Sequence, residues 1–209
     1  MTKQERLQKE IERTALMKEF EKPYADKIVC GIDEVGRGPL CGPVVAGAVI
    51  LPKDCDILYI NDSKKLSEKK REEVNSAILE KAIAVGIGVV GPERIDEINI
   101  LQATFEAMRM AIDSLKVKPD ILLNDAVEIP LVDIEQVPIV KGDAKSMSIA
   151  AASIVAKVYR DHLMEEYDSL YPEYAIGKNK GYGTAAHIDA IKKYGLTPIH
   201  RRSFTKNFV

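Results

Sequence analysis

Apolar residues along the 209-residue chain gather in short runs that are separated by charged, amphipathic stretches. Residues 44–51, VVAGAVIL, contain no polar side chain, and such a run is typical of a strand buried on both faces. In the apolar run 84–90, Gly86 and Gly88 indicate a bulge or the close approach of another backbone. We predict strands at residues 27–32, 44–51, 84–90, 121–124 and 137–140.

Other stretches repeat apolar residues every three or four positions, which indicates helices. We predict helices at residues 3–22, 67–82, 99–115, 146–170 and 184–194. The fourth of these opens with IAAAS, whose small side chains allow another element to approach closely. Strands that alternate with helices predict an α/β fold, a mixed sheet with helices on its faces. Residues 1–26 read as a charged helical appendage to one main domain, residues 27–209.

The composition narrows the class of protein. Hydrophobic residues make up 46% of the chain and charged residues 30%, as in globular proteins that fold in water. No apolar run approaches the ~20 residues of a membrane span, and the charged N-terminus has no apolar signal core, so we expect a cytoplasmic protein. The three cysteines form no C-x-x-C pair, so neither a disulfide framework nor a zinc knuckle is indicated.

The net charge of −2 does not by itself indicate a nucleic-acid-binding protein, but its distribution is uneven. Residues 63–71 carry five basic residues and one acid, and residues 178–206 carry seven basic residues and one acid. Either segment alone reads as solvated surface. Together with an acidic cluster, they indicate a track for a phosphate backbone beside a metal site.

Two adjacent acids, Asp33 and Glu34, follow the apolar run of the first predicted strand, in the segment GIDEVGRGPLCGP. Unpaired charge is costly in a strand core, so this pair indicates a functional site. Successive strand residues point to opposite faces, so the two carboxylates share a site only if the strand ends or bends there. Gly36 and Gly38 permit such a bend.

Two further acids occupy strand ends. Asp125 directly follows ILLN, and Asp143 follows VPIVKG and precedes a long helix. In open α/β sheets, ligands bind outside the carboxyl ends of the strands. Converging carboxylates repel one another unless a cation joins them, and Mg²⁺ or Mn²⁺ is the hard divalent ion that suits oxygen ligands. Alternatively, Asp125 is an ordinary loop acid and Asp143 is the N-cap of the following helix.

Three other kinds of site lack their motifs. Cys41 stands where a dinucleotide-binding G-x-G-x-x-G needs its third glycine. The segment GDAKS lacks the first glycine and the spacing of a P-loop, and no G-x-S-x-G marks a hydrolase nucleophile.

Four motifs in this order resemble the bacterial ribonuclease HII family, the type 2 ribonucleases H. They are GIDEVGRGPLCGPVVAGAVIL, DSKKLS (62–67), GDAKSMSIAAASIVAKVYRD (142–161) and KGYGTAAH (180–187), and the resemblance covers residues 27–204. Arg37, between two glycines, distinguishes the chain from the sister type, ribonuclease HIII.

The resemblance implies an RNase H-like fold, a five-stranded mixed sheet flanked by helices, with a C-terminal helical portion. Residues 27–209 would then form the catalytic domain. The implied activity is cleavage of the RNA strand of RNA–DNA hybrids and of the 5′ side of ribonucleotides embedded in duplex DNA. Products with 5′-phosphate and 3′-hydroxyl ends, roles in ribonucleotide and RNA-primer removal, and a monomeric enzyme are also implied.

The resemblance also assigns a metal site. Two cations, Mg²⁺ or Mn²⁺, would be held by Asp33, Glu34, Asp125 and Asp143. Asp161 of the YRD segment is not part of this set. Relatives often have glycine after the third acid, where this chain has Ala126, whose methyl group is expected to crowd the site.

Substrate contacts follow from the same motifs. The ribose would be read by Gly36, Arg37, Gly38 and Tyr182. Phosphates would be contacted by Lys64 and Lys145. Tyr182 could instead be an ordinary core or surface tyrosine, and we leave His187 and His200 outside the catalytic set.

Two rival functions belong to other classes. A non-catalytic hybrid-binding protein would use metal only as a structural tie, although four acids beside an anionic ligand disfavour pure binding. A metal-dependent phosphotransferase on a related fold would need a nucleotide phosphate loop, which is missing. Cleavage without ATP distinguishes a nuclease from both.

Overall fold

The computed structural model describes residues 2–61 and 63–209. A five-stranded sheet has the order β3-β2-β1-β4-β5. Its strands are β1 Val29–Val35, β2 Val44–Ile50, β3 Ala84–Val90, β4 Ile121–Asp125 and β5 Glu135–Ile139. β1 and β3 each pair antiparallel with β2, whereas β4 runs parallel to both β1 and β5. The predicted mixed α/β sheet is therefore confirmed.

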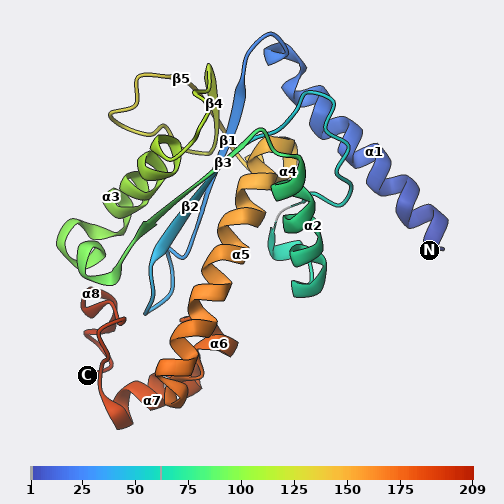
Figure 1. Ribbon diagram of the computed structural model, residues 1–209. Helices are drawn as coiled ribbons and strands as arrows, with labels where there is room; N and C mark the ends of the chain where they lie inside the picture. The colour runs from blue at the N-terminus through green and yellow to red at the C-terminus, as the bar shows by residue number, and fades with distance from the viewer. Residues whose placement is uncertain (1, 62) are drawn as a thin grey trace.

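Helices flank this sheet (Figure 1). They are α1 Lys3–Glu21, α2 Glu68–Lys81, α3 Pro92–Asp113, α4 Gly142–Lys145, α5 Met147–Leu170, α6 Ile176–Asn179, α7 Ala185–Tyr194 and α8 Arg202–Thr205. Short 3-10 turns are η1 Lys22–Tyr24, η2 Ser63–Lys65 and η3 Pro172–Tyr174. α3 covers one face of the sheet, α5 and α2 lie on the other, and α6 to α8 form a C-terminal helical portion (Figure 1). No helix among the described residues is both long and apolar enough to span a bilayer.

α5 lies unusually close to the centre of the sheet. A Cβ atom on Gly31 would stand 2.0 Å from the backbone of Ser148, and one on Gly47 would stand 2.6 Å from the carbonyl oxygen of Ala152. Glycine on the strands and small residues on the helix let the two backbones meet, as the IAAAS segment predicted. This contact fixes α5 against β1 and β2.

The glycines of β3 serve the same purpose on the opposite face. Cβ atoms on Gly86 and Gly88 would stand 2.0 and 1.9 Å from carbonyl oxygens of Ala111 and Ala107 on α3. The pairing of β3 with β2 runs without interruption from one end to the other. Of the two predicted explanations, close backbone approach is confirmed and a bulge is not found.

The largest boundary differences from the sequence prediction are at the start of α3 and the end of β1, and both have physical reasons. α3 begins at Pro92 rather than at residue 99, and Asn99 marks a kink, with φ 67° inside the helix. The Asn99 side chain accepts hydrogen bonds from the backbone N–H groups of Leu101 and Gln102, so it caps the second half. β1 continues to Val35 rather than ending at residue 32, because its antiparallel pairing with β2 persists to that point.

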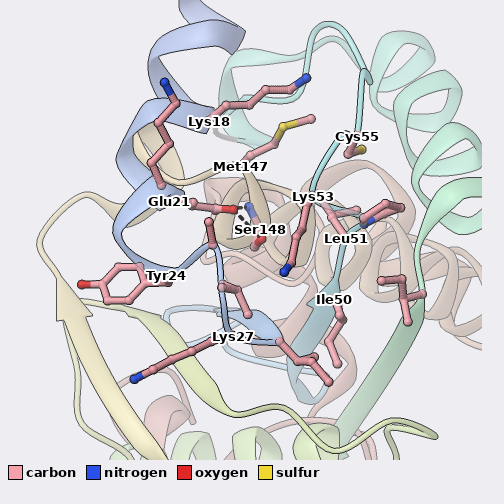
Figure 2. A pocket seen from close by; sticks show the side chains of 16 residues that line it. Lys18, Glu21, Tyr24, Lys27, Ile50, Leu51, Lys53, Cys55, Met147 and Ser148 are labelled. Atoms are coloured by element: carbon pink, nitrogen blue, oxygen red, sulfur yellow. Dashed lines mark hydrogen bonds between the residues drawn. The ribbon is translucent and has the colours of Figure 1, made fainter.

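α1 is tied to the start of α5 by one side chain. The Glu21 carboxylate accepts hydrogen bonds from the Ser148 backbone N–H at 2.8 Å and from the Ser148 hydroxyl at 3.1 Å (Figure 2). It also accepts one from the Ser146 hydroxyl. Met17, 2% exposed, packs into the cluster between α5 and the sheet. Beside this contact, at the amino end of β1, lies a mainly apolar pocket of about 280 Å³ that Lys53 enters (Figure 2).

Candidate active site

The strand order brings the predicted acids to one edge of the sheet. Because β1, β4 and β5 are parallel, their carboxyl ends meet at this edge. Asp33 and Glu34 lie near the end of β1, and Asp125 is the last residue of β4. Asp143 lies in the first turn of α4, which follows β5.

Asp33 and Glu34 lie inside β1, so the expectation that the strand ends before them is wrong. Their side chains leave opposite faces of the strand. Asp33 is 7% exposed and hydrogen-bonds Ser153 on α5. Glu34 is half-buried, and its Oε1 lies 3.3 Å from Nη1 of Arg37. The charge of Asp125 nevertheless contributes to raising the pKa of both carboxyl groups, so Asp125 lies near each of them.

The electrostatics of these carboxyl groups suit a cation. Burial, followed by the charges of Glu34 and Asp125, holds the pKa of Asp33 well above its usual range. Burial also raises the pKa of Glu34, although Arg37 partly opposes the rise. Carboxylates that are both buried and mutually repulsive are stabilised as anions by a hard divalent ion, and their donor atoms are all oxygen. The residues present therefore fit Mg²⁺ or Mn²⁺.

α4 is attached directly to the end of β4. The backbone N–H of Gly142 donates to Oδ1 of Asp125 at 2.7 Å. Asp143, half-buried, is the next residue, so this hydrogen bond sets it beside Asp125. The N-cap residues are Lys141 for α4 and Ser146 for α5, so the alternative that Asp143 is a helix N-cap is wrong.

The carboxylates are neighbours rather than a compact cluster. Within residues 2–61 and 63–209, the group of three or more possible ligand side chains whose donor atoms lie within 4.8 Å of one another is Cys41, His187 and His200. That group is buried where the loop after β1, which carries Cys41, meets the C-terminal portion, which carries His187 and His200. The first residue of the DSKKLS motif, Asp62, lies outside the described residues.

Ala126, the residue after the third acid, has a left-handed backbone with φ 59°. Its N–H donates at 3.1 Å to the carbonyl of Ile139, the last residue of β5, which continues the parallel pairing of β4 and β5 by one hydrogen bond. A non-glycine residue in this conformation costs roughly 1 kcal/mol. Glycine therefore suits this position because of backbone conformation. The side chain of Ala126 is exposed, and the expected crowding of the site by its methyl group stays a prediction.

The glycines after β1 have different surroundings. Gly36 has φ +94°, and a Cβ there would stand 2.4 Å from Nε of Arg160 and 2.7 Å from the Pro43 carbonyl oxygen. Gly38 is exposed and has no such conflict, since its nearest neighbour is the Tyr182 ring at 3.6 Å. Tyr182 is 48% exposed, so the structure brings its ring and the Gly38 backbone together at the surface.

Sequence reasoning missed two buried arginines that hold this loop. Arg201 is 0% exposed, and its guanidinium donates to the carbonyls of Gly42 at 2.9 Å, Arg37 at 3.0 Å and Gly36 at 2.6 Å. Arg201 is therefore not one of the solvated basic residues that the composition of residues 178–206 indicated. Burial, with the nearby charge of Arg160, lowers the pKa of Arg201 to about 9, so the side chain remains mainly charged at neutral pH.

Arg160 joins the same loop to the segment that carries Tyr182. It is also 0% exposed, and it donates to the carbonyls of Pro43 at 3.0 Å, Cys41 at 3.2 Å and Lys180 at 3.0 Å. In the sequence, Arg160 lies in the segment YRD within a helix rich in apolar residues, and Arg201 lies in the segment HRRSF. These positions are the sequence features that could have indicated buried arginines.

The remaining predicted residues lie around the edge. Lys64 is exposed on η2. Its charge opposes the rise in the pKa of Glu34 that burial causes, so Lys64 lies near the acids. Lys145 is exposed at the end of α4. Asp161 is 4% exposed and paired with Lys157 and, at 3.4 Å, with Arg71, which balances its charge without a metal.

The comparisons with known proteins agree with one another. The family model for Ribonuclease HII matches residues 30–207. The ribonuclease HII of Lachnoclostridium phytofermentans is 65% identical over 204 residues, which cover 97% of this chain and 80% of that protein. The ribonuclease H2 of Pyrococcus horikoshii OT3 has a TM-score of 0.72 at 28% identity and covers 86% of this chain and 96% of that one.

These matches confirm the resemblance read from the motifs and the RNase H-like fold. The relatives are nucleases, so the chain is an enzyme, a phosphodiester hydrolase. The chain belongs to the ribonuclease HII family, whose members cleave RNA in RNA–DNA hybrids.

Proposed function

We propose that the protein cuts the RNA strand of RNA–DNA hybrids and the 5′ side of ribonucleotides embedded in duplex DNA. The products carry 5′-phosphate and 3′-hydroxyl ends. In the cell this activity would serve ribonucleotide removal and RNA-primer removal. The observation that carries the proposal is the placement of Asp33, Glu34 and Asp125 at one sheet edge, a few residues from the Gly38–Tyr182 contact.

Two divalent cations, Mg²⁺ or Mn²⁺, are the proposed cofactors. They would be held by Asp33, Glu34, Asp125 and Asp143. When bound, such ions lower the pKa of an attacking water and stabilise the leaving 3′-oxygen. The protein supplies the anionic oxygens and their rigid support: Ser153 hydrogen-bonds Asp33, and the Gly142 N–H orients Asp125.

The Gly38–Tyr182 contact is proposed to recognise the ribose. The 2′-hydroxyl both donates and accepts hydrogen bonds, and it is the group that distinguishes RNA from DNA. Gly38 has no side chain to keep the sugar away from the Gly36–Gly38 backbone, and the exposed Tyr182 phenol can hydrogen-bond the hydroxyl or stack on the sugar. Arg37 remains linked to Glu34 and so connects this reader to the carboxylates.

Phosphate contacts are assigned to Lys64 and Lys145, which are both exposed near the acidic edge. Such contacts position a duplex and carry no base sequence information. Cleavage should therefore weaken as salt rises and be insensitive to base identity. We further propose that the enzyme acts as a monomer in the cytoplasm, which gel filtration with light scattering and cell fractionation would test.

The first experiment compares three duplexes: DNA with one ribonucleotide, an RNA–DNA hybrid, and DNA alone. Each is incubated with Mg²⁺, Mn²⁺ or a chelator, without ATP. We expect metal-dependent cutting on the 5′ side of the single ribonucleotide and none of the all-DNA duplex. A folded protein that binds these duplexes and cuts none with either metal would contradict the proposal.

Two variants separate the metal site from the ribose reader. Asp33→Asn should abolish cleavage, with exposed Asp113→Asn as the matched control. Tyr182→Phe should reduce cleavage while Mn²⁺ binding, measured by calorimetry, persists. Near-normal cleavage by Asp33→Asn would refute the metal-site assignment, and loss of Mn²⁺ binding in Tyr182→Phe would refute the ribose-reading role.

A further inference from the structure

Two buried histidines lie directly below the loop that carries Tyr182. His187 and His200 are 0% and 3% exposed, and their Nε2 atoms are 3.1 Å apart. Nδ1 of His187 lies 2.9 Å from the carbonyl oxygen of Tyr182. Nδ1 of His200 lies 3.0 Å from the backbone nitrogen of Thr197 and 2.8 Å from its hydroxyl. The four ring nitrogens therefore form one continuous chain.

The direction of each hydrogen bond follows from its ends. The backbone N–H of Thr197 can only donate, so Nδ1 of His200 accepts and its proton is on Nε2. That Nε2–H then donates to Nε2 of His187, which accepts. The proton of His187 is consequently on Nδ1 and donates to the Tyr182 carbonyl. A single pair of neutral tautomers satisfies every nitrogen.

The surroundings keep both rings uncharged. Burial lowers the pKa of each, and for His200 the nearby His187 helps to lower it to about 4. The Tyr174 ring packs on both, with centroids 5.0 Å from His200 and 6.2 Å from His187. A second proton on His187 would place its Nε2–H against the Nε2–H of His200 across 3.1 Å, and a second proton on His200 would place its Nδ1–H against the Thr197 N–H across 3.0 Å.

A metal ion is the competing explanation, because the Cys41 thiol lies within 4.8 Å of donor nitrogens on both rings. The hydrogen-bond pattern argues against it. Every ring nitrogen already has a partner that needs no metal, and burial raises the pKa of the Cys41 thiol to about 12, which keeps it protonated. The cluster is therefore read as a hydrogen-bonded support.

This support joins the two parts of the proposed ribose reader. The Tyr182 carbonyl accepts from His187 and, at 2.8 Å, from the Thr184 N–H. On the other side, His200 pairs with Cys41 in an isolated antiparallel bridge, and the Leu40 N–H donates to the Gly181 carbonyl at 2.8 Å. These contacts hold the backbone around Tyr182 in a fixed position relative to the loop that contains Gly38.

We propose that His187 and His200 are positioning residues that set Tyr182 against Gly38 and so determine how well a ribose is recognised. The inference rests on the proposed function, because it assumes that Tyr182 contacts the substrate. Neither histidine touches the reacting atoms. The two histidines act on Tyr182 through one hydrogen bond, from Nδ1 of His187 to the Tyr182 carbonyl. Ribose recognition should therefore depend on an N–H donor at this place, and a side chain other than imidazole that supplies one should suffice.

The tautomers are tested without any variant. Long-range ¹H–¹⁵N spectra of ¹⁵N-histidine-labelled protein at pH 7 report which ring nitrogen carries the proton. We expect Nδ1–H for His187 and Nε2–H for His200. A charged ring, the reverse pair of tautomers, or one equivalent of zinc in metal-free buffer would overturn the inference.

Activity is tested with paired substitutions at one position. His187→Asn keeps an N–H near the place of Nδ1, whereas His187→Leu removes it. On duplex DNA with one ribonucleotide, His187→Leu should lower kcat/KM by about 10²-fold, the scale expected for a misplaced substrate-contacting group. His187→Asn should recover most of this, and His162→Asn, on an exposed ring, should have no effect.

The outcomes distinguish this inference from the proposed function. Failure of wild type to cut the embedded ribonucleotide, or normal kcat/KM in Tyr182→Phe, would remove the function on which the inference rests. A loss in Tyr182→Phe together with normal kcat/KM in folded His187→Leu would refute the inference alone. If His187→Leu does not fold, His200→Leu removes the donor to Nε2 of His187 instead, and an unchanged kcat/KM in folded His200→Leu would refute the inference.

Discussion

The Arg201 guanidinium donates a 2.6 Å hydrogen bond to the carbonyl oxygen of Gly36, a residue 165 positions earlier in the chain. Two more donations, to Gly42 and Arg37, use the rest of the guanidinium plane. The C-terminal segment therefore fixes the backbone that lies immediately after the acids of β1. The three carbonyl dipoles stabilise this buried cation, and the Asp96 carboxylate adds a further electrostatic attraction.

Arg201→Lys should destabilise the protein strongly, because an ammonium group cannot reach three carbonyls in one plane. Hydrogen bonds to a charged group contribute about 1.5–3 kcal/mol each, so a loss of roughly 3 kcal/mol in the free energy of unfolding is expected. Urea unfolding measures this loss. Arg202→Lys, next in sequence and exposed, is the matched control, and equal stabilities of the two variants would contradict the role of Arg201.

Alanine substitutions at the two glycines after β1 should separate stability from activity. Gly36→Ala meets a strained φ of +94° and the Arg160 side chain, so it should cost about 2–4 kcal/mol in unfolding free energy. Gly38→Ala adds a methyl group in ordinary contact with the Tyr182 ring and should leave stability within about 1 kcal/mol. Its cleavage of embedded ribonucleotides should nevertheless fall, because the methyl group occupies the proposed path of the ribose.

These two variants are compared by urea unfolding and by kcat/KM on the same duplex. If Gly38→Ala is as active as wild type, the sugar does not approach this backbone closely. If Gly36→Ala is as stable as wild type, the loop after β1 can move away from the Arg160 side chain, and the close packing at Gly36 does not contribute to stability.

Ala126→Gly should stabilise the protein, since glycine adopts φ 59° without strain. The gain of about 1 kcal/mol from relieved strain is partly offset by the larger entropy of glycine in the unfolded chain, so a net gain of roughly 0.5 kcal/mol is expected. Ala15→Gly, on the exposed side of α1, is the control and should cost about 1 kcal/mol. If both variants lower the denaturant midpoint, the backbone at Ala126 is not strained.

Glu21→Ala should release α1 from the active-site helix. The Glu21 carboxylate satisfies N–H and hydroxyl donors at the start of α5 and adds negative charge where the helix dipole favours it. We expect a loss of about 2 kcal/mol in the free energy of unfolding. Hydrogen exchange should also show faster opening of α1 and of the Ser146–Ser148 backbone.

Glu19→Ala is the matched control two residues earlier in the same helix. Glu19 forms an exposed ion pair with Lys22, and such pairs contribute about 0–1 kcal/mol. If Glu19→Ala and Glu21→Ala are equally stable, the contact between α1 and α5 does not hold the appendage in place.

Much of this protein could be predicted from local patterns in its sequence. Apolar runs and helical periodicity located every strand and the long helices, and acids placed directly after apolar runs indicated a site at the carboxyl edge of the sheet. Gly86 and Gly88 indicated either a bulge or close backbone approach, and the second is what the structure has. These features could be predicted because they depend on residues that are close together in the sequence. Such residues determine whether a segment is buried and whether its buried positions repeat as in a strand or as in a helix.

Only the tertiary structure decided which distant segments complete the site. The length of β1 depends on pairing with β2, so Asp33 and Glu34 lie within a strand whose apolar run had already ended. Arg201 and His200 belong to a basic tail by composition, yet both are buried, because carbonyls and ring nitrogens far away in sequence satisfy them. A charged or polar residue enters a core only when its partners are present, and sequence spacing carries no record of partners that chain folding brings together.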